Sequence, residues 1–229
     1  MIQKAIIFDA STIITFSMNG LLDELRKLKE VFNGKFLITE DVRREIVDKP
    51  MKIKRFKLEA IGISQLINDK VLEMPASVNV NEDLISKKTK EFKDVANNMF
   101  EAKGNFLNII DSGETSCLAL SRILDDKGIK NIIAVDERTM RMLGEKPENL
   151  EDLFRRKLHT PVTLKKENFK IFEGFKFIRS SELVYVAYKK KIFKLKNGVL
   201  DALLYAVKSK GCAISGDEIR EIIRMDRKG

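Results

Sequence analysis

Short apolar runs alternate along the chain with longer stretches in which apolar residues recur at helical spacing. The runs predict buried strands over 5–8, 35–38 and 132–135. The helical spacing predicts helices between them, over 19–32, 40–48, 51–70, 115–126 and 137–143. Apolar strands that alternate with helices indicate a parallel sheet with helices on both faces. The hydrophobic pattern therefore predicts an α/β fold.

Two parts of the chain depart from this alternation. Residues 82–103 are polar and predict one long helix, inside an insert that spans about 50–105. After residue 150 the pattern predicts short helices rather than more sheet, over 181–190, 200–209 and 217–225. Ser215 and Glu218 have the spacing of a capping box at the start of the last one. We therefore expect a first domain over 1–150 and a mainly helical C-terminal extension over 151–229.

The charge divides at the same boundary. Residues 1–150 carry 24 basic and 24 acidic side chains, whereas residues 151–229 carry 19 basic and 10 acidic ones. The extension thus holds the whole formal net charge of +9. Such segregation favours a polyanionic partner, nucleic acid above all, over the alternative of a charge-rich thermophile surface. The densest cationic cluster is Lys189, Lys190 and Lys191, which we expect to contact phosphates.

Cysteine and histidine are scarce. The chain has two cysteines and one histidine, His159. A zinc site would lack most of its nitrogen and sulfur ligands, and a catalytic triad would have to depend on His159 alone. Chemistry by carboxylates without imidazoles indicates Mg²⁺ or Mn²⁺. No apolar stretch approaches 18 residues, and the first apolar run is too short for a signal peptide. We expect a cytoplasmic protein that makes no use of a membrane.

Acidic residues stand where the predicted elements meet. Asp9 and Asp136 each end a predicted strand, and ligands of parallel sheets bind beyond the carboxyl ends of the strands. Asp111 and Glu114 are three residues apart at the start of a predicted helix, so both can point to one place. Glu45 lies in the helix after the second strand. Four or five of these acids, from four separate segments, are therefore expected to converge on one cleft.

A cluster of carboxylates is unfavourable without a counter-charge, because mutual repulsion raises some of the pKa values. A bound divalent cation removes that repulsion. It can also activate a water molecule and stabilise the attacking and leaving oxygens of a phosphodiester. Acids in the first domain and cations in the extension therefore favour metal-dependent cleavage of nucleic acid.

The order and spacing of these acids resemble the PIN domain family, in its longer prokaryotic and archaeal form. The resemblance covers residues 1–145 well and the extension loosely, and it leaves the insert over about 50–105 uncovered. Four segments carry it: Ile6-Ile7-Phe8-Asp9-Ala10-Ser11, Thr39 to Ile46, Asp111 to Leu120, and Ile132 to Arg138. The chain departs from many members by having Ala134 where a hydroxyl residue often stands, and Glu114 where aspartate is more common.

The resemblance implies a three-layer α/β/α fold and an endoribonuclease that hydrolyses single-stranded or structured RNA with Mg²⁺ or Mn²⁺. It implies that Asp9, Glu45, Glu114 and Asp136 are the catalytic acids. The metal ligands would be the same four and Asp111, which is an alternative or additional third acid. We expect Ser11, the hydroxyl that accompanies the first acid, to lie at the nucleic acid beside Lys189 to Lys191.

Two other functions remain open at this point. A PIN-fold protein can be a catalytically weak or inactive RNA-binding factor, for example in ribosome maturation. A haloacid dehalogenase-like phosphatase also begins with a strand ending in Asp, but it needs a second Asp where this chain has Ser11. The sequence also leaves open whether the protein partner is a second copy of the chain, an antitoxin or a ribosome-assembly factor.

Overall fold

The structure is a computed structural model, and it describes residues 4–194 and 198–227. Its centre is a parallel sheet of four strands in the order β2–β1–β5–β7. The strands are β1 (Lys4–Phe8), β2 (Lys35–Leu37), β5 (Lys130–Ala134) and β7 (Phe177–Ile178). The first three confirm the strands expected from the apolar runs, and β7 adds an edge strand from the C-terminal third.

Strands β1 and β5 are neighbours at the centre of the sheet. Their register pairs Ile7 with Ile133 and Phe8 with Ala134. The N–H of Asp9 continues this ladder by donating to the carbonyl of Ala134 at 2.9 Å. Because the strands are parallel, the residues that follow them emerge at the same edge of the sheet. Asp9 and Asp136, each expected to follow a strand, therefore follow neighbouring strands of the sheet.

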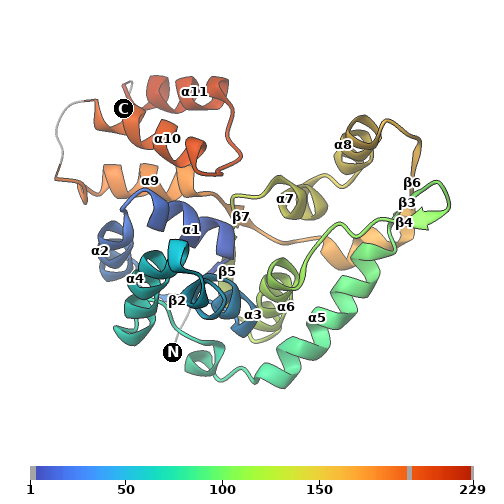
Figure 1. Cartoon of the computed structure of the whole chain (residues 1–229), viewed down its shortest axis with the longest axis horizontal. Coiled ribbons are helices and arrows are strands. Elements are labelled where there is room, and N and C mark those ends of the chain that lie inside the picture. Colours follow the sequence, from blue (N-terminus) through green and yellow to red (C-terminus); the bar gives the residue numbers. More distant parts are fainter. Residues whose placement is uncertain (1–3, 195–197, 228–229) are drawn as a thin grey trace.

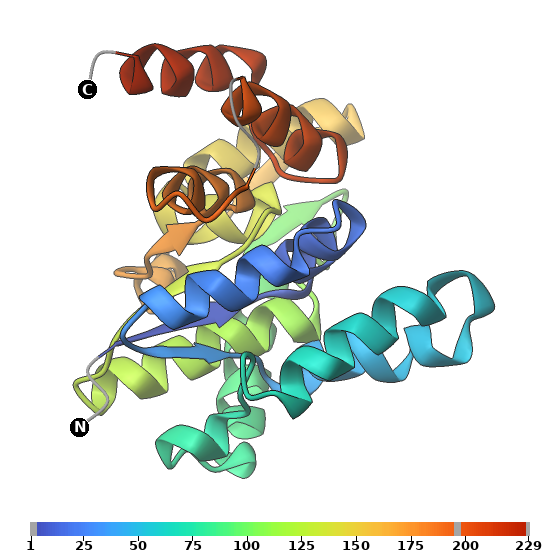
Figure 2. The same ribbon diagram turned by 90° about the vertical axis from the view of Figure 1, so that its left-hand side faces the viewer.

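Helices flank both faces of the sheet. Helix α1 (Ala10–Met18), with α9 (Ser180–Lys189), lies on one side of it, and α6 (Ser112–Asp126) lies on the other (Figures 1 and 2). This coverage explains why β1 is an uninterrupted apolar run, since both of its faces are buried. The protein is thus a mixed α/β fold with a parallel central sheet, consistent with three α/β/α layers.

The segment between β2 and α6 contains the helical insert. It comprises α3 (Glu40–Arg43), a π-helix (Arg44–Asp48), two short 3₁₀ turns, α4 (Lys57–Asn68), a third 3₁₀ turn (Pro75–Val78) and α5 (Glu82–Asn97). The long helix expected over 82–103 is too long, because α5 ends at Asn97. Lys103 and Gly104, both with positive φ, form a two-residue turn of the kind that hairpins favour. That turn joins β3 (Phe100–Ala102) to β4 (Asn105–Phe106), and β6 (Val162–Leu164) completes a small antiparallel sheet.

The chain after β5 is mostly helical. It forms α7 (Arg138–Glu145), α8 (Glu148–Leu158), a 3₁₀ segment (Lys166–Phe172) and, after α9, the helices α10 (Val199–Ser209) and α11 (Gly216–Asp226). The three helices expected after residue 180 are confirmed, as is the capping box of Ser215 and Glu218. The expectation of no further sheet is wrong, because β6 and β7 both lie after residue 150. No helix in the described residues combines the length and apolarity needed to cross a membrane.

Candidate functional site

Asp9 stands at the junction of β1 and α1. It is the N-cap of α1, and its Oδ2 accepts hydrogen bonds from the N–H of Ser11 at 3.0 Å and from Ser11 Oγ at 2.5 Å. The side chain is almost fully buried, with a residue exposure of 3%. Burial raises the pKa of Asp9 to about 6, although the hydrogen bonds from Ser11 act in the opposite direction. Asp9 is therefore a fixed, buried carboxylate at the carboxyl edge of the sheet.

Asp111 and Glu114 form a capping box at the start of α6. The N–H of Glu114 donates to Asp111 Oδ1 at 3.0 Å, and the N–H of Asp111 donates to Glu114 Oε2 at 3.3 Å. The other carboxylate oxygen of Glu114, Oε1, is buried and has no hydrogen-bond partner among the described residues. A buried acceptor without a partner is costly, so this oxygen is available to a ligand.

Glu45 reaches the same place from a different segment. It lies in the π-helix Arg44–Asp48, a conformation that occurs often at functional sites. A Cβ atom added to Gly113 would lie 2.9 Å from Glu45 Oε2 and 3.4 Å from Asp111 Oδ1. The missing side chain of Gly113 therefore leaves the space in which these two carboxylates approach each other.

The pKa values record the mutual repulsion of these acids. Burial first, and then the charges of Asp9 and Asp111, raise the pKa of Glu114 to about 9. Burial, Asp111 and Asp9, in that order, raise the pKa of Glu45 to about 7. Four of the five acids expected from the sequence thus lie within one electrostatic cluster, which we call the acidic cluster: Asp9, Glu45, Asp111 and Glu114.

Glu137 is an additional acid that the sequence analysis did not single out. It is the N-cap residue of α7, yet its side chain makes no capping hydrogen bond and is exposed. Its charge contributes to the raised pKa values of both Glu45 and Glu114. Its place immediately after a strand-terminal acid was the signal available in the sequence.

Asp136, the fifth expected acid, has its carboxylate directed to α9. It is fully buried, and its Oδ1 and Oδ2 accept hydrogen bonds from the N–H and the Oγ of Ser180 at 2.7 and 2.6 Å. Its backbone N–H donates to Ser11 Oγ at 3.0 Å. Ser11 Oγ is thereby held between Asp9 and the backbone of Asp136. The carboxylate of Asp136 anchors the start of α9, whereas its backbone supports Asp9 through Ser11.

The acidic cluster has the donor chemistry of a site for a hard divalent cation. Over residues 4–194 and 198–227, no three His, Cys, Asp or Glu side chains form a ready-made group that could hold a metal ion. The donors that are present are nevertheless all carboxylate oxygens, the ligands that Mg²⁺ and Mn²⁺ prefer. The partnerless Oε1 of Glu114 and the space beside Gly113 both fit a cation between these side chains.

The expected phosphate-binding lysines lie at the far end of α9 from Ser180. Lys189 is the last residue of that helix, and its Nζ pairs with Asp226 Oδ1 at 3.1 Å. Lys190 and Lys191 follow directly. A helix of ten residues is about 15 Å long, so this cluster is separated from the Asp136 anchor by roughly that length. Lys49 is closer to the acids, because its positive charge partly opposes the rise in the pKa of Glu45.

Replacing Gly113 with Ala tests the approach of Glu45 to α6. The new Cβ would displace the Glu45 carboxylate, and the helix position itself would gain roughly 0.5–1 kcal/mol from the better helix former. We expect G113A to fold at least as stably as the wild type but to bind Mn²⁺ at least about tenfold more weakly, measured from the metal dependence of thermal unfolding. As a control, Gly62→Ala places a Cβ in α4, 3.1 Å from a flexible carbon of Leu22, and should leave metal binding unchanged. Wild-type metal affinity in G113A would contradict this placement of Glu45.

The acids of this site come from four separate places in the chain: the end of β1, the π-helix, the start of α6 and the start of α7. They lie at the edge of a parallel sheet where ligands of such folds bind. No protein-family model, curated protein or solved structure matches the chain.

Proposed function

We propose that this protein is a cytoplasmic, metal-dependent endoribonuclease with a PIN-like fold, which hydrolyses phosphodiester bonds of RNA at the acidic cluster. The observation that carries the proposal is the convergence of Asp9, Glu45 and Glu114, whose pKa values are all raised, with Asp111 beside them. Acids whose pKa values are raised by burial and by one another occur preferentially at functional sites. The order of these acids along the chain and their place at the sheet edge agree with the PIN resemblance.

Some residues of the site would bind the metal ion, and others hold those residues in position. Mg²⁺ or Mn²⁺, when bound, would offset the negative charge, lower the pKa of a water molecule and stabilise the charge that develops on the phosphate. Asp9, Glu45 and Glu114 would hold the cation, and Asp111 would add a further carboxylate. Ser11 holds the Asp9 carboxylate in one orientation, and the capping box does the same for Asp111 and Glu114.

Asp136 receives a different role from the one that the resemblance implied. Both of its carboxylate oxygens are already used by Ser180, so we propose that it is a positioning residue, acting on Asp9 through Ser11. Glu137, which is exposed and makes no capping bond, would take the place of the fourth acid. This assignment keeps four separate chain segments around the site.

The second candidate function is a catalytically weak or inactive RNA-binding factor. It is favoured by the absence, among the described side chains, of a ready-made metal-binding group. In that case the acids would remain partly protonated near neutral pH and would contribute to binding a partner rather than to hydrolysis.

Cleavage assays separate the two functions. We expect 5′-labelled single-stranded RNA to be cut internally with Mg²⁺ or Mn²⁺ and to stay intact with a chelator. The Asp9→Asn protein, purified in parallel, should leave the RNA intact under all conditions and so excludes a contaminating nuclease. RNA bound but never cut, over a panel of sequences and both metals, would favour the binding factor.

A further inference from the structure

A strongly basic segment follows the π-helix that carries Glu45. Residues 49–58, which we call the basic segment, contain five cations and no acid: Lys49, Lys52, Lys54, Arg55 and Lys57. The segment forms two 3₁₀ turns and the first residues of α4. All five cations are exposed. The neutral total of residues 1–150 conceals this local concentration of charge.

These cations are not paired with acids within the described part of the chain. The ion pairs among the described residues include none from the basic segment. Apolar side chains are interleaved with them and are unusually open to solvent: Ile53 is 47% exposed, Phe56 41% and Leu58 79%. The guanidinium carbon of Arg55 lies 5.2 Å from the centre of the Phe56 ring. An exposed aromatic ring among free cations is typical of a surface that binds single-stranded nucleic acid.

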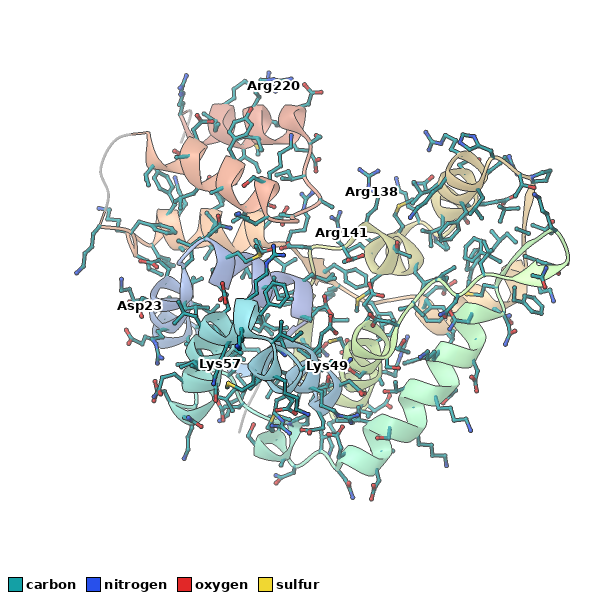
Figure 3. The ribbon with its side chains drawn as sticks, viewed as in Figure 1. Asp23, Lys49, Lys57, Arg138, Arg141 and Arg220 are labelled. Carbon is teal, nitrogen blue, oxygen red and sulfur yellow. The ribbon has the colours of Figure 1, made fainter. Side chains whose placement is uncertain are left out.

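The basic segment adjoins the acidic cluster. Lys49 directly follows the π-helix that carries Glu45, and its N–H donates to the carbonyl of Arg44 at 2.9 Å. Figure 3 labels Lys49 and Lys57 in the lower part of the molecule, with Arg138 and Arg141 above them. A strand that reaches Lys49 along this segment would therefore arrive at the helix that carries Glu45.

Two arginines lie on α7, the helix that begins directly after Glu137. Arg138 directly follows Glu137, and Arg141 is one turn further along α7. Together with Arg156 of α8 they line a pocket of about 310 Å³. Within the described part of the chain, neither Arg138 nor Arg141 takes part in an ion pair. Their guanidinium groups are thus available to bind phosphates bidentately.

We propose that single-stranded RNA crosses the acidic cluster between these two groups of cations. Phosphates on one side of the cleaved bond bind the basic segment, with a base stacked on Phe56. Phosphates on the other side bind Arg138 and Arg141. This assignment deepens the proposed function and rests on it for the position of the cleaved bond. It also moves the main RNA contact from Lys189–Lys191 to residues beside the acids.

Lysines with exposed apolar residues also suit an anionic membrane surface. The pocket beside α7 favours RNA, because a strand can enter a concave site and a flat bilayer surface cannot. Phosphates at every nucleotide also match cations placed on two sides of one cluster. Binding to lipid is therefore an outcome that the experiment must be able to reveal.

The test measures RNA binding separately from cleavage. Fluorescence anisotropy with a labelled 12-nucleotide RNA, in a chelator so that no cutting occurs, compares K52A/K54A/K57A with K189A/K190A/K191A. Both variants lose three lysines, so their change in net charge is equal. We expect the first to weaken binding at least about tenfold and to flatten the salt dependence by up to about 0.7 per lost contact. The second should have a much smaller effect, and R138A/R141A should resemble the first.

A second pair of variants tests stacking. Phe56→Ala should weaken RNA binding about tenfold, whereas Phe106→Ala should not. Phe106 is a matched control because it is 46% exposed and has Lys165 Nζ 4.3 Å from its ring centre, but it lies on β4. Thermal unfolding of each variant checks that affinity is lost without loss of the fold.

Three results would overturn this inference. They are no measurable RNA binding by the wild type, equal weakening by the two lysine variants, and tighter binding to phosphatidylglycerol vesicles than to RNA. Failure here is distinguishable from failure of the proposed function. Metal-dependent cleavage with unchanged affinity in K52A/K54A/K57A would overturn the RNA path alone. Binding that these variants weaken, without cleavage under any metal, would overturn the nuclease alone.

Discussion

Glu114→Gln should reduce metal-dependent RNA cleavage by at least about a hundredfold, and by more than Asp111→Asn does. Glu114 Oε1 is buried without a partner, and the pKa of this acid is raised to about 9, so its charge is offset least by the protein itself. Losing a catalytic metal ligand is worth several kcal/mol. Asp111 is exposed and serves as the N-cap of α6, a role that Asn performs as well.

Single-turnover cleavage rates at saturating metal show which of the two variants, Glu114→Gln or Asp111→Asn, loses more activity. Gln at position 114 can still complete the capping box, so the variant is expected to keep its fold. Glu91→Gln, on the exposed face of α5, is a matched control and should cleave at the wild-type rate. A larger loss in Asp111→Asn than in Glu114→Gln would make Asp111 the third acid.

The convergence of the acids could be predicted because it depends on features that are local in sequence. The apolar runs predicted that β1 and β5 belong to a parallel sheet. Asp9 and Asp136, which follow these strands, are then expected at the same end of the sheet. The three-residue spacing of Asp111 and Glu114 fixed their common face on α6. What local patterns could not supply is the direction of a side chain after a strand. Asp9 and Asp136 look equivalent in the sequence, but Ser180, which holds Asp136, is 44 residues away from it.

The errors have equally physical causes. Strand β7 has only two residues, too few for a periodic pattern, and it is held by pairing with β5. The division of charge at residue 150 averaged the basic segment against acids elsewhere in the first domain. The expectation of RNA contacts at Lys189–Lys191 came from that average, and it stays a prediction that the two lysine variants test.

The second large effect is expected on stability. Burial raises the pKa of Asp9 to about 6, from an ordinary value of 3.8. The folded state therefore favours the protonated acid, and the free energy of unfolding falls as pH rises from about 4 to 6. A shift of about two units corresponds to roughly 3 kcal/mol, which is lost in full above pH 6. Asn removes the charge and can still cap α1. Without metal, Asp9→Asn should exceed the wild type by about 1–3 kcal/mol at pH 8 and match it below pH 4.

With metal present, the wild type should be more stable than Asp9→Asn. Millimolar Mg²⁺ or Mn²⁺ binds the folded state and should raise the Tm of the wild type by mass action, whereas the Tm of Asp9→Asn should stay unchanged. Asp136→Ala provides the contrast: it leaves the N–H and Oγ of Ser180 without their acceptor, so its Tm should fall with or without metal. Its metal-induced rise should persist, because the acidic cluster is intact. Calorimetric unfolding of the three proteins at pH 4 and pH 8, with and without metal, gives these comparisons. A metal response in Asp9→Asn equal to that of the wild type would remove Asp9 from the site, since its charge would then make no difference to the cation.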